Sequence, residues 1–119
     1  PSGRVLCYPN AKFDDEGNVT YTKAAWKPAA DAKEWPRARL WRGLACENVV
    51  QATANDILRH SLRRLDGVIA HVHDEIVVEC PEDQADAMST HMLEIMRTPP
   101  AWAEGLPLNA EGTVTRRYS

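Results

Sequence analysis

The stretch that decides the fold spans residues 67–79 and reads Gly-Val-Ile-Ala-His-Val-His-Asp-Glu-Ile-Val-Val-Glu. Its two halves are rich in β-branched residues and alternate over short distances, which is typical of strands. The break between them falls at His73-Asp74-Glu75, where a tight turn must lie if both halves are to pair. The sequence therefore predicts a β-hairpin. The residues expected to share one face of its first strand are Val68, Ala70 and Val72.

Amphipathic helices are expected on both sides of this hairpin. Residues 47–65 carry apolar side chains at helical spacing, and Asp66-Gly67 supplies a stop. Pro81 with two following carboxylates has the form of a second helix start, and Thr98-Pro99 ends that helix. The expected buried stripes are Val50, Ala54, Ile57, Leu58, Leu62 and Leu65 in the first helix, and Ala85, Met88, Met92 and Ile95 in the second.

Further short strands are expected near both ends of the chain. Residues 3–8 and 19–21 alternate well enough for strands, and the second of these follows a turn at 14–18. A loop is expected over 27–36 and a last strand within 106–118. The order strand, helix, hairpin, helix, strand describes an α+β fold, in which two helices pack on one face of an antiparallel sheet.

The composition fits one ordinary globular domain, with 119 residues of which 44% are hydrophobic and 26% charged. No stretch approaches the roughly 20 apolar residues of a membrane helix, and no basic-then-apolar leader opens the chain. We therefore expect a cytoplasmic protein with no membrane partner. Because the first residue is Pro1 and not methionine, the chain is expected to be a fragment of a longer polypeptide.

The overall charge argues against a free-standing nucleic-acid binder. The net charge is -3 and the pI is about 5.8, whereas neutralising phosphates usually requires an excess of Lys and Arg. Local arginine clusters at 37–42, 59–64 and 116–117 soften this argument. Such clusters are more often solvated faces than binding sites.

Asp74 is the strongest candidate for chemistry. A carboxylate at the tip of a hairpin is held by two paired strands yet projects beyond their hydrogen bonds, so it is both rigid and open to a ligand. Mg²⁺ prefers hard oxygen ligands and takes one or two protein carboxylates, which Asp74 and Glu75 could supply. The alternative is that Asp74 only forms the turn and that His73 is a surface histidine.

The residues around Asp74 decide between these alternatives. Residues 72–79, Val-His-Asp-Glu-Ile-Val-Val-Glu, resemble motif C of family A DNA polymerases. Residues 47–52, Glu-Asn-Val-Val-Gln-Ala, resemble the helix that precedes motif C in the bacteriophage-type branch, and residues 102–118 resemble its closing segment. The resemblance covers nearly the whole chain in the same order. Residues 1–119 are therefore expected to form the C-terminal portion of a polymerase palm.

The resemblance implies template-directed DNA synthesis with two Mg²⁺ ions. In that family the Asp of motif C binds the catalytic metals, which maps to Asp74. The Glu lies beside the metal site and the His lies near the primer terminus, which maps to Glu75 and His73. Gln51 resembles a glutamine that reaches the minor groove at the terminal base pair, although a solvated helical glutamine is the alternative. Primer-template DNA and deoxynucleoside triphosphates are the implied partners.

The resemblance also implies parts that this chain does not match. In the family a second aspartate comes from motif A and the triphosphate is held by a fingers helix, both upstream. The chain alone is therefore expected to be inactive without the remainder of the polymerase, and to self-associate through apolar surface. Two alternatives stay open. One is a non-catalytic palm remnant or interaction module from a prophage-type gene, and the other is a binding domain with a chance motif, in which Asp74 would be buried or salt-bridged.

Overall fold

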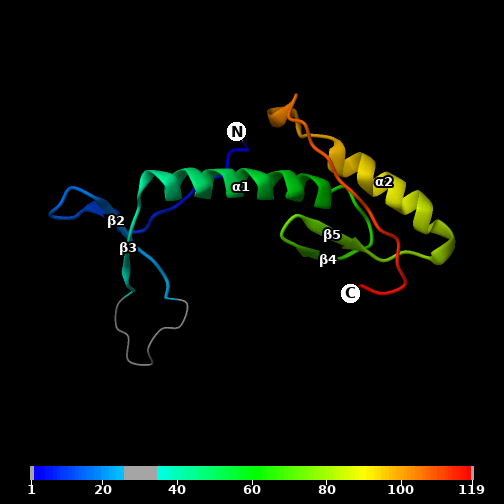
Figure 1. The fold of residues 1–119 in the computed structure, drawn as a ribbon, viewed down its shortest axis with the longest axis horizontal. Coiled ribbons are helices and arrows are strands. Elements are labelled where there is room, and N and C mark those ends of the chain that lie inside the picture. The colour runs from blue at the N-terminus through cyan, green and yellow to red at the C-terminus, as the bar shows by residue number, and fades with distance from the viewer. Residues whose placement is uncertain (1, 26–34, 119) are drawn as a thin grey trace. The chain divides into compact units, whose positions relative to one another are not determined.

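The computed structural model describes residues 2–25 and 35–118 (Figure 1). The chain divides into two compact units. The hairpin unit comprises Ala52–Ser119 with Pro1–Gly3, and the N-terminal unit comprises Arg4–Gln51. Both units contain antiparallel strands, and helix α1 (Arg42–Leu62) begins in one and ends in the other. The predicted α+β class is confirmed, with the strands divided between two small sheets.

The N-terminal unit contains a three-stranded antiparallel sheet in the order β1-β2-β3. Its strands are β1 (Lys12–Phe13), β2 (Val19–Thr22) and β3 (Arg37–Arg39). The turn between β1 and β2 forms because the carboxylate of Asp14 accepts the backbone N–H groups of Glu16 and Asn18, at 3.0 and 2.8 Å. The predicted turn at 14–18 and the strand after it are therefore confirmed.

One other prediction for this unit is wrong, and one lies almost entirely outside the described residues. Residues 3–8 pair with no strand in the described structure. At the end of this segment the hydroxyl of Tyr8 accepts a hydrogen bond from Nδ2 of Asn48 over 2.9 Å, and its ring meets that of Tyr21 edge-on. The predicted loop over 27–36 lies mostly outside the described residues, and β3 follows it. That strand was not predicted, since three residues give too short an alternation to detect.

Helix α1 starts at Arg42, five residues before its predicted start. Its apolar stripe is buried only toward its C-terminal end, at Leu58, and again at Leu65 after the helix. Val50 is 61% exposed and Ala54 is exposed as well, so the predicted stripe is wrong at these positions. Apolar residues at helical spacing show which face of a helix can be buried. The elements that pack against that face decide how much of it is buried.

The hairpin unit is built on strands β4 (Val68–Val72) and β5 (Glu75–Val78), which pair antiparallel as predicted. The register is interrupted between Val68 and Ala70, so that β4 carries a bulge at Ile69. The bulge shifts the alternation by one residue. Val68 therefore packs against the core, whereas Ala70 and Val72 are exposed, and the prediction that the three share a face is wrong.

Both helices pack on the same face of this hairpin, as predicted. The core consists of Leu58 from α1, Leu65 from the connection, and Ile76 from β5. Helix α2 (Ala85–Arg97) ends just before Thr98, as predicted, whereas the predicted start after Pro81 forms a 3₁₀ turn, η1 (Glu82–Gln84), that leads into the helix. The side chains packed around this core are Leu62, Val68, Val78, Met92, Ile95 and Met96.

After α2 the chain forms one more 3₁₀ turn, η2 (Ala101–Ala103), and then an extended tail. The predicted last strand within 106–118 is wrong, because these residues pair with no strand in the described structure. They pack instead against a helix: a Cβ built on Gly112 would lie 3.5 Å from Leu93. In the described part of the chain, neither helix combines the length and apolarity needed to cross a bilayer.

Candidate functional site

The loop between β4 and β5 consists of two residues, His73 and Asp74. Val72 and Glu75 pair across its base. Such short loops require a positive φ angle, which glycine or asparagine usually supplies, and here His73 adopts a φ of +53°. For a residue with a side chain this conformation costs about 1 kcal/mol. Strained residues of this kind concentrate at functional sites.

The side chain of Asp74 is exposed at this turn. Within the part of the chain that the structure describes, its carboxylate takes part in no ion pair and accepts no hydrogen bond. Asp74 is therefore neither buried nor salt-bridged in the described structure, although an Asp that only forms the turn would be exposed as well. The paired strands fix the backbone at Asp74, while its carboxylate oxygens have no partner among the described residues.

Glu75 is also exposed but has a partner. The hydroxyl of Tyr118 donates a hydrogen bond to Glu75 Oε2 over 3.0 Å. This hydrogen bond, and then the negative charge of Glu75, raise the pKa of the Tyr118 hydroxyl above its ordinary value. The sequence did not single out Tyr118, because no local pattern joins two residues that lie 43 positions apart.

The donor chemistry of the turn suits Mg²⁺. Asp74 and Glu75 offer hard carboxylate oxygens, and protein sites for Mg²⁺ often supply only one or two such groups, with phosphate and water completing the shell. Among the described residues, no three or more side chains of His, Cys, Asp or Glu gather into a possible metal site. Asp74 and Glu75, which are neighbours in the sequence, have the donor chemistry of a protein share of a magnesium site.

Gln51 belongs to the N-terminal unit, whereas His73, Asp74 and Glu75 are contiguous in the hairpin unit. Its side chain is exposed on α1, and its Nε2 donates to Glu47 Oε1 over 3.1 Å. A contact one helical turn away is also what a solvated glutamine makes. The proposed contact of Gln51 with DNA therefore stays a prediction.

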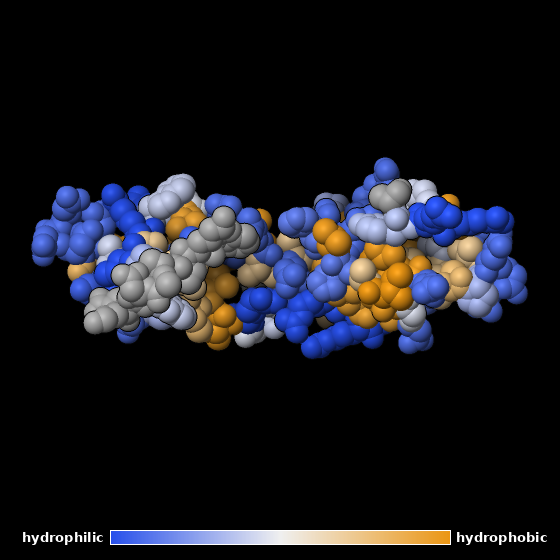
Figure 2. Space-filling view, turned by 90° about the horizontal axis from the view of Figure 1, so that it is seen from below, coloured by the Kyte–Doolittle hydropathy of each residue, from blue (hydrophilic) through white to orange (hydrophobic). Residues whose placement is uncertain are grey.

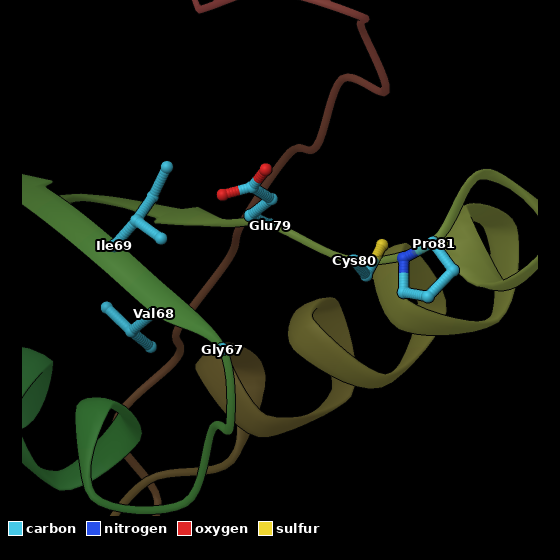
Figure 3. Close-up of a pocket in the computed structure, with 6 residues that line it drawn as sticks. All are labelled: Gly67, Val68, Ile69, Glu79, Cys80 and Pro81. Carbon is cyan, nitrogen blue, oxygen red and sulfur yellow. The ribbon is translucent and has the colours of Figure 1, made fainter.

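A shallow hollow of about 550 Å³ lies at the base of the hairpin, where β4 begins and the chain leaves β5 (Figure 3). Val68 and Ile69 line it from the start of β4, and Glu79, Cys80 and Pro81 line it from the connection to η1. Ligand sites normally combine an enclosed apolar pocket with a few convergent polar groups. This hollow is open and has one carboxylate, so the turn is the better candidate.

Comparison with known proteins gives one informative similarity. The DNA polymerase of Bacillus phage SP02 is 36% identical to this chain over 122 aligned residues, which cover 99% of the chain and 18% of the polymerase. The chain thus spans less than a fifth of the length of the curated relative it matches. No family model and no solved structure matches the chain. Over almost all of its residues, therefore, the chain is similar to one part of a phage DNA polymerase.

Proposed function

We propose that this chain is part of a DNA-directed DNA polymerase of family A, bacteriophage type, and presents the aspartate of motif C. The observation that carries the proposal is the exposed Asp74 at a two-residue turn whose first residue, His73, is strained. Strain at an exposed turn is not needed for folding, since glycine would avoid it. The similarity to a phage DNA polymerase supports the same function independently.

In this proposal each residue of the turn has its own role. Asp74, together with Glu75, holds divalent cations, and His73 contacts the primer terminus. When bound, two such ions stabilise the attacking and leaving oxygens of an in-line phosphoryl displacement. Gln51 contacts the minor groove, where its amide can both donate and accept hydrogen bonds. The remainder of the polymerase supplies the second aspartate and the residues that grip the triphosphate.

The test is primer extension by the polymerase that contains this chain, with Asp74→Asn compared with the unmodified enzyme. Losing a metal ligand removes several kcal/mol of transition-state stabilisation, so kcat is expected to fall about a thousandfold. Binding of primer-template DNA is expected to persist. Asp83→Asn, which changes an exposed carboxylate in η1, is the matched control. Equal activity of the two variants would contradict the proposal, and an unmodified protein that binds DNA without extending it would indicate a non-catalytic remnant.

The strain at His73 provides a second test. Replacing His73 with glycine removes the unfavourable φ and is expected to raise the free energy of unfolding by about 0.5–1 kcal/mol. Primer extension is expected to fall, because the imidazole is lost. His73→Ala keeps the strain and loses the same ring, so it is expected to lower extension without the gain in stability. Urea unfolding of the chain measures the first effect, and an unstable His73→Gly variant would contradict the argument.

A further inference from the structure

Residues 110–118 form a strap that is held against α2 by successive contacts. Nη2 of Arg97 donates to the carbonyl oxygen of Ala110 over 2.5 Å. Gly112 lies against the middle of the helix, where a Cβ would stand 3.3 Å from Ser89 Oγ. Arg116 forms an ion pair of 2.6 Å with Glu82, just before the helix.

The order of these contacts gives the direction of the strap. As the tail proceeds from residue 110 to 116, its partners move backward from residue 97 to 82. The strap therefore runs antiparallel to α2, as the orange and red segments show (Figure 1). It then leaves the helix, and Tyr118 reaches Glu75, the residue next to Asp74.

The environment of Tyr118 indicates what this contact does. The residue is 60% exposed, so its ring is not a core anchor. Glu75 is exposed as well, and water would satisfy its carboxylate without a protein partner. A free glutamate samples several rotamers. A hydrogen bond from a strap that is anchored at Ala110 and Arg116 restricts them.

We propose that Tyr118 is a positioning residue for Glu75. By donating to Oε2 it restricts the orientation of the Glu75 carboxylate and leaves the second oxygen for a divalent cation. The strap along α2 thereby connects the tail to the metal-binding turn. This inference rests on the proposed function, because the orientation of Glu75 matters to catalysis only if Asp74 and Glu75 hold metal ions.

The test uses the isotope-labelled chain with Mn²⁺ as a paramagnetic probe in NMR. In the unmodified chain, Mn²⁺ is expected to broaden the amide resonances of Asp74 and Glu75. Tyr118→Phe removes only the hydroxyl. The Glu75 side chain is then expected to sample several χ1 rotamers, so that its three-bond couplings move to averaged values. Mn²⁺ binding is expected to weaken about two- to fivefold, the size of effect typical of an exposed polar pair. Tyr21→Phe, which removes a hydroxyl in the N-terminal unit, is expected to change neither.

The two proposals fail in different ways in this experiment. If Tyr118→Phe leaves the Glu75 couplings and the Mn²⁺ affinity unchanged, the positioning role is overturned while Asp74 stands as a ligand. If Asp74→Asn leaves the Mn²⁺ broadening unchanged, the proposed function fails, and the positioning role fails with it. Arg116→Ala removes the ion pair between the strap and Glu82. It is expected to change the Glu75 couplings and the Mn²⁺ affinity in the same direction as Tyr118→Phe, but by a smaller amount.

Discussion

Gly67 lies between α1 and the hairpin, where its backbone conformation and its surroundings both disfavour a side chain. Its φ is +72°, and a Cβ would lie 2.8 Å from the carbonyl oxygen of Glu79, whose N–H donates to Gly67. Gly67→Ala is therefore expected to lower the free energy of unfolding by about 2–4 kcal/mol, from the left-handed backbone and from the displaced Glu79 peptide. Urea unfolding measures this loss.

Gly105 provides the matched control for that substitution. Its φ is +82°, but nothing lies within 4 Å of a Cβ built there. Gly105→Ala is therefore expected to lower the free energy of unfolding by about 1 kcal/mol, from the backbone conformation alone. If the two alanine variants unfold at the same urea concentration, the clash at Glu79 contributes nothing and the argument for Gly67 is wrong.

At the scale of elements, the turn between β1 and β2 depends on pH through Asp14. The backbone N–H of Asn18, followed by weaker contacts, lowers the pKa of the Asp14 carboxyl. A folded-state pKa below the ordinary value of about 3.9 means that the ionised form stabilises the turn. This contribution is complete above the ordinary value and is lost as the pH falls through the lowered one.

The measurement is an NMR titration of the backbone amide of Asn18. Its chemical shift is expected to move away from the value of the hydrogen-bonded amide only at pH values below the ordinary pKa of an aspartate. Asp14→Asn is expected to remove this pH dependence while retaining an oxygen acceptor. Asp15→Asn alters a neighbouring exposed carboxylate outside these hydrogen bonds and is expected to retain it. A titration that survives in Asp14→Asn would assign the effect to another group.

The elements that could be predicted are those with strong local signals. The hairpin turn at His73 and Asp74, and the helix start after Pro81, follow from residue types and spacing within a few positions. The bulge at Ile69 and the early start of α1 could not be predicted, because they depend on which neighbours pack there. The tail packs against α2, where Gly112 has no side chain and therefore lies close to the helix.

The candidate site also combines residues that a local motif predicts with one that only the folded chain brings to it. His73, Asp74 and Glu75 are contiguous at the hairpin turn, so one motif was enough to propose all three. Tyr118 joins them only through the folded path of the strap, and no periodicity in the sequence encodes that path. Contacts between distant positions become visible only once the elements are placed.

At the scale of the whole molecule, apolar surface on the hairpin unit predicts self-association. Apolar side chains gather on the face of this unit shown in the right half of Figure 2. On β4, Ile69 is 61% and Val72 is 46% exposed. Two copies that cover such a surface remove it from water. Sedimentation is expected to show association that Ile69→Lys weakens, whereas Val49→Lys on α1 does not. A monomeric mass at all concentrations would contradict this prediction.

The chain alone is expected not to extend a primer. Asp74 and Glu75 without substrate phosphates make a poor Mg²⁺ site, and a net charge of -3 opposes binding to the DNA backbone. Mg²⁺ affinity measured by calorimetry and binding of primer-template DNA are therefore both expected to be weak. The assay compares the 119-residue chain with the polymerase that contains it. Nucleotide incorporation by the unmodified chain, absent in Asp74→Asn, would show that these residues already hold a complete site.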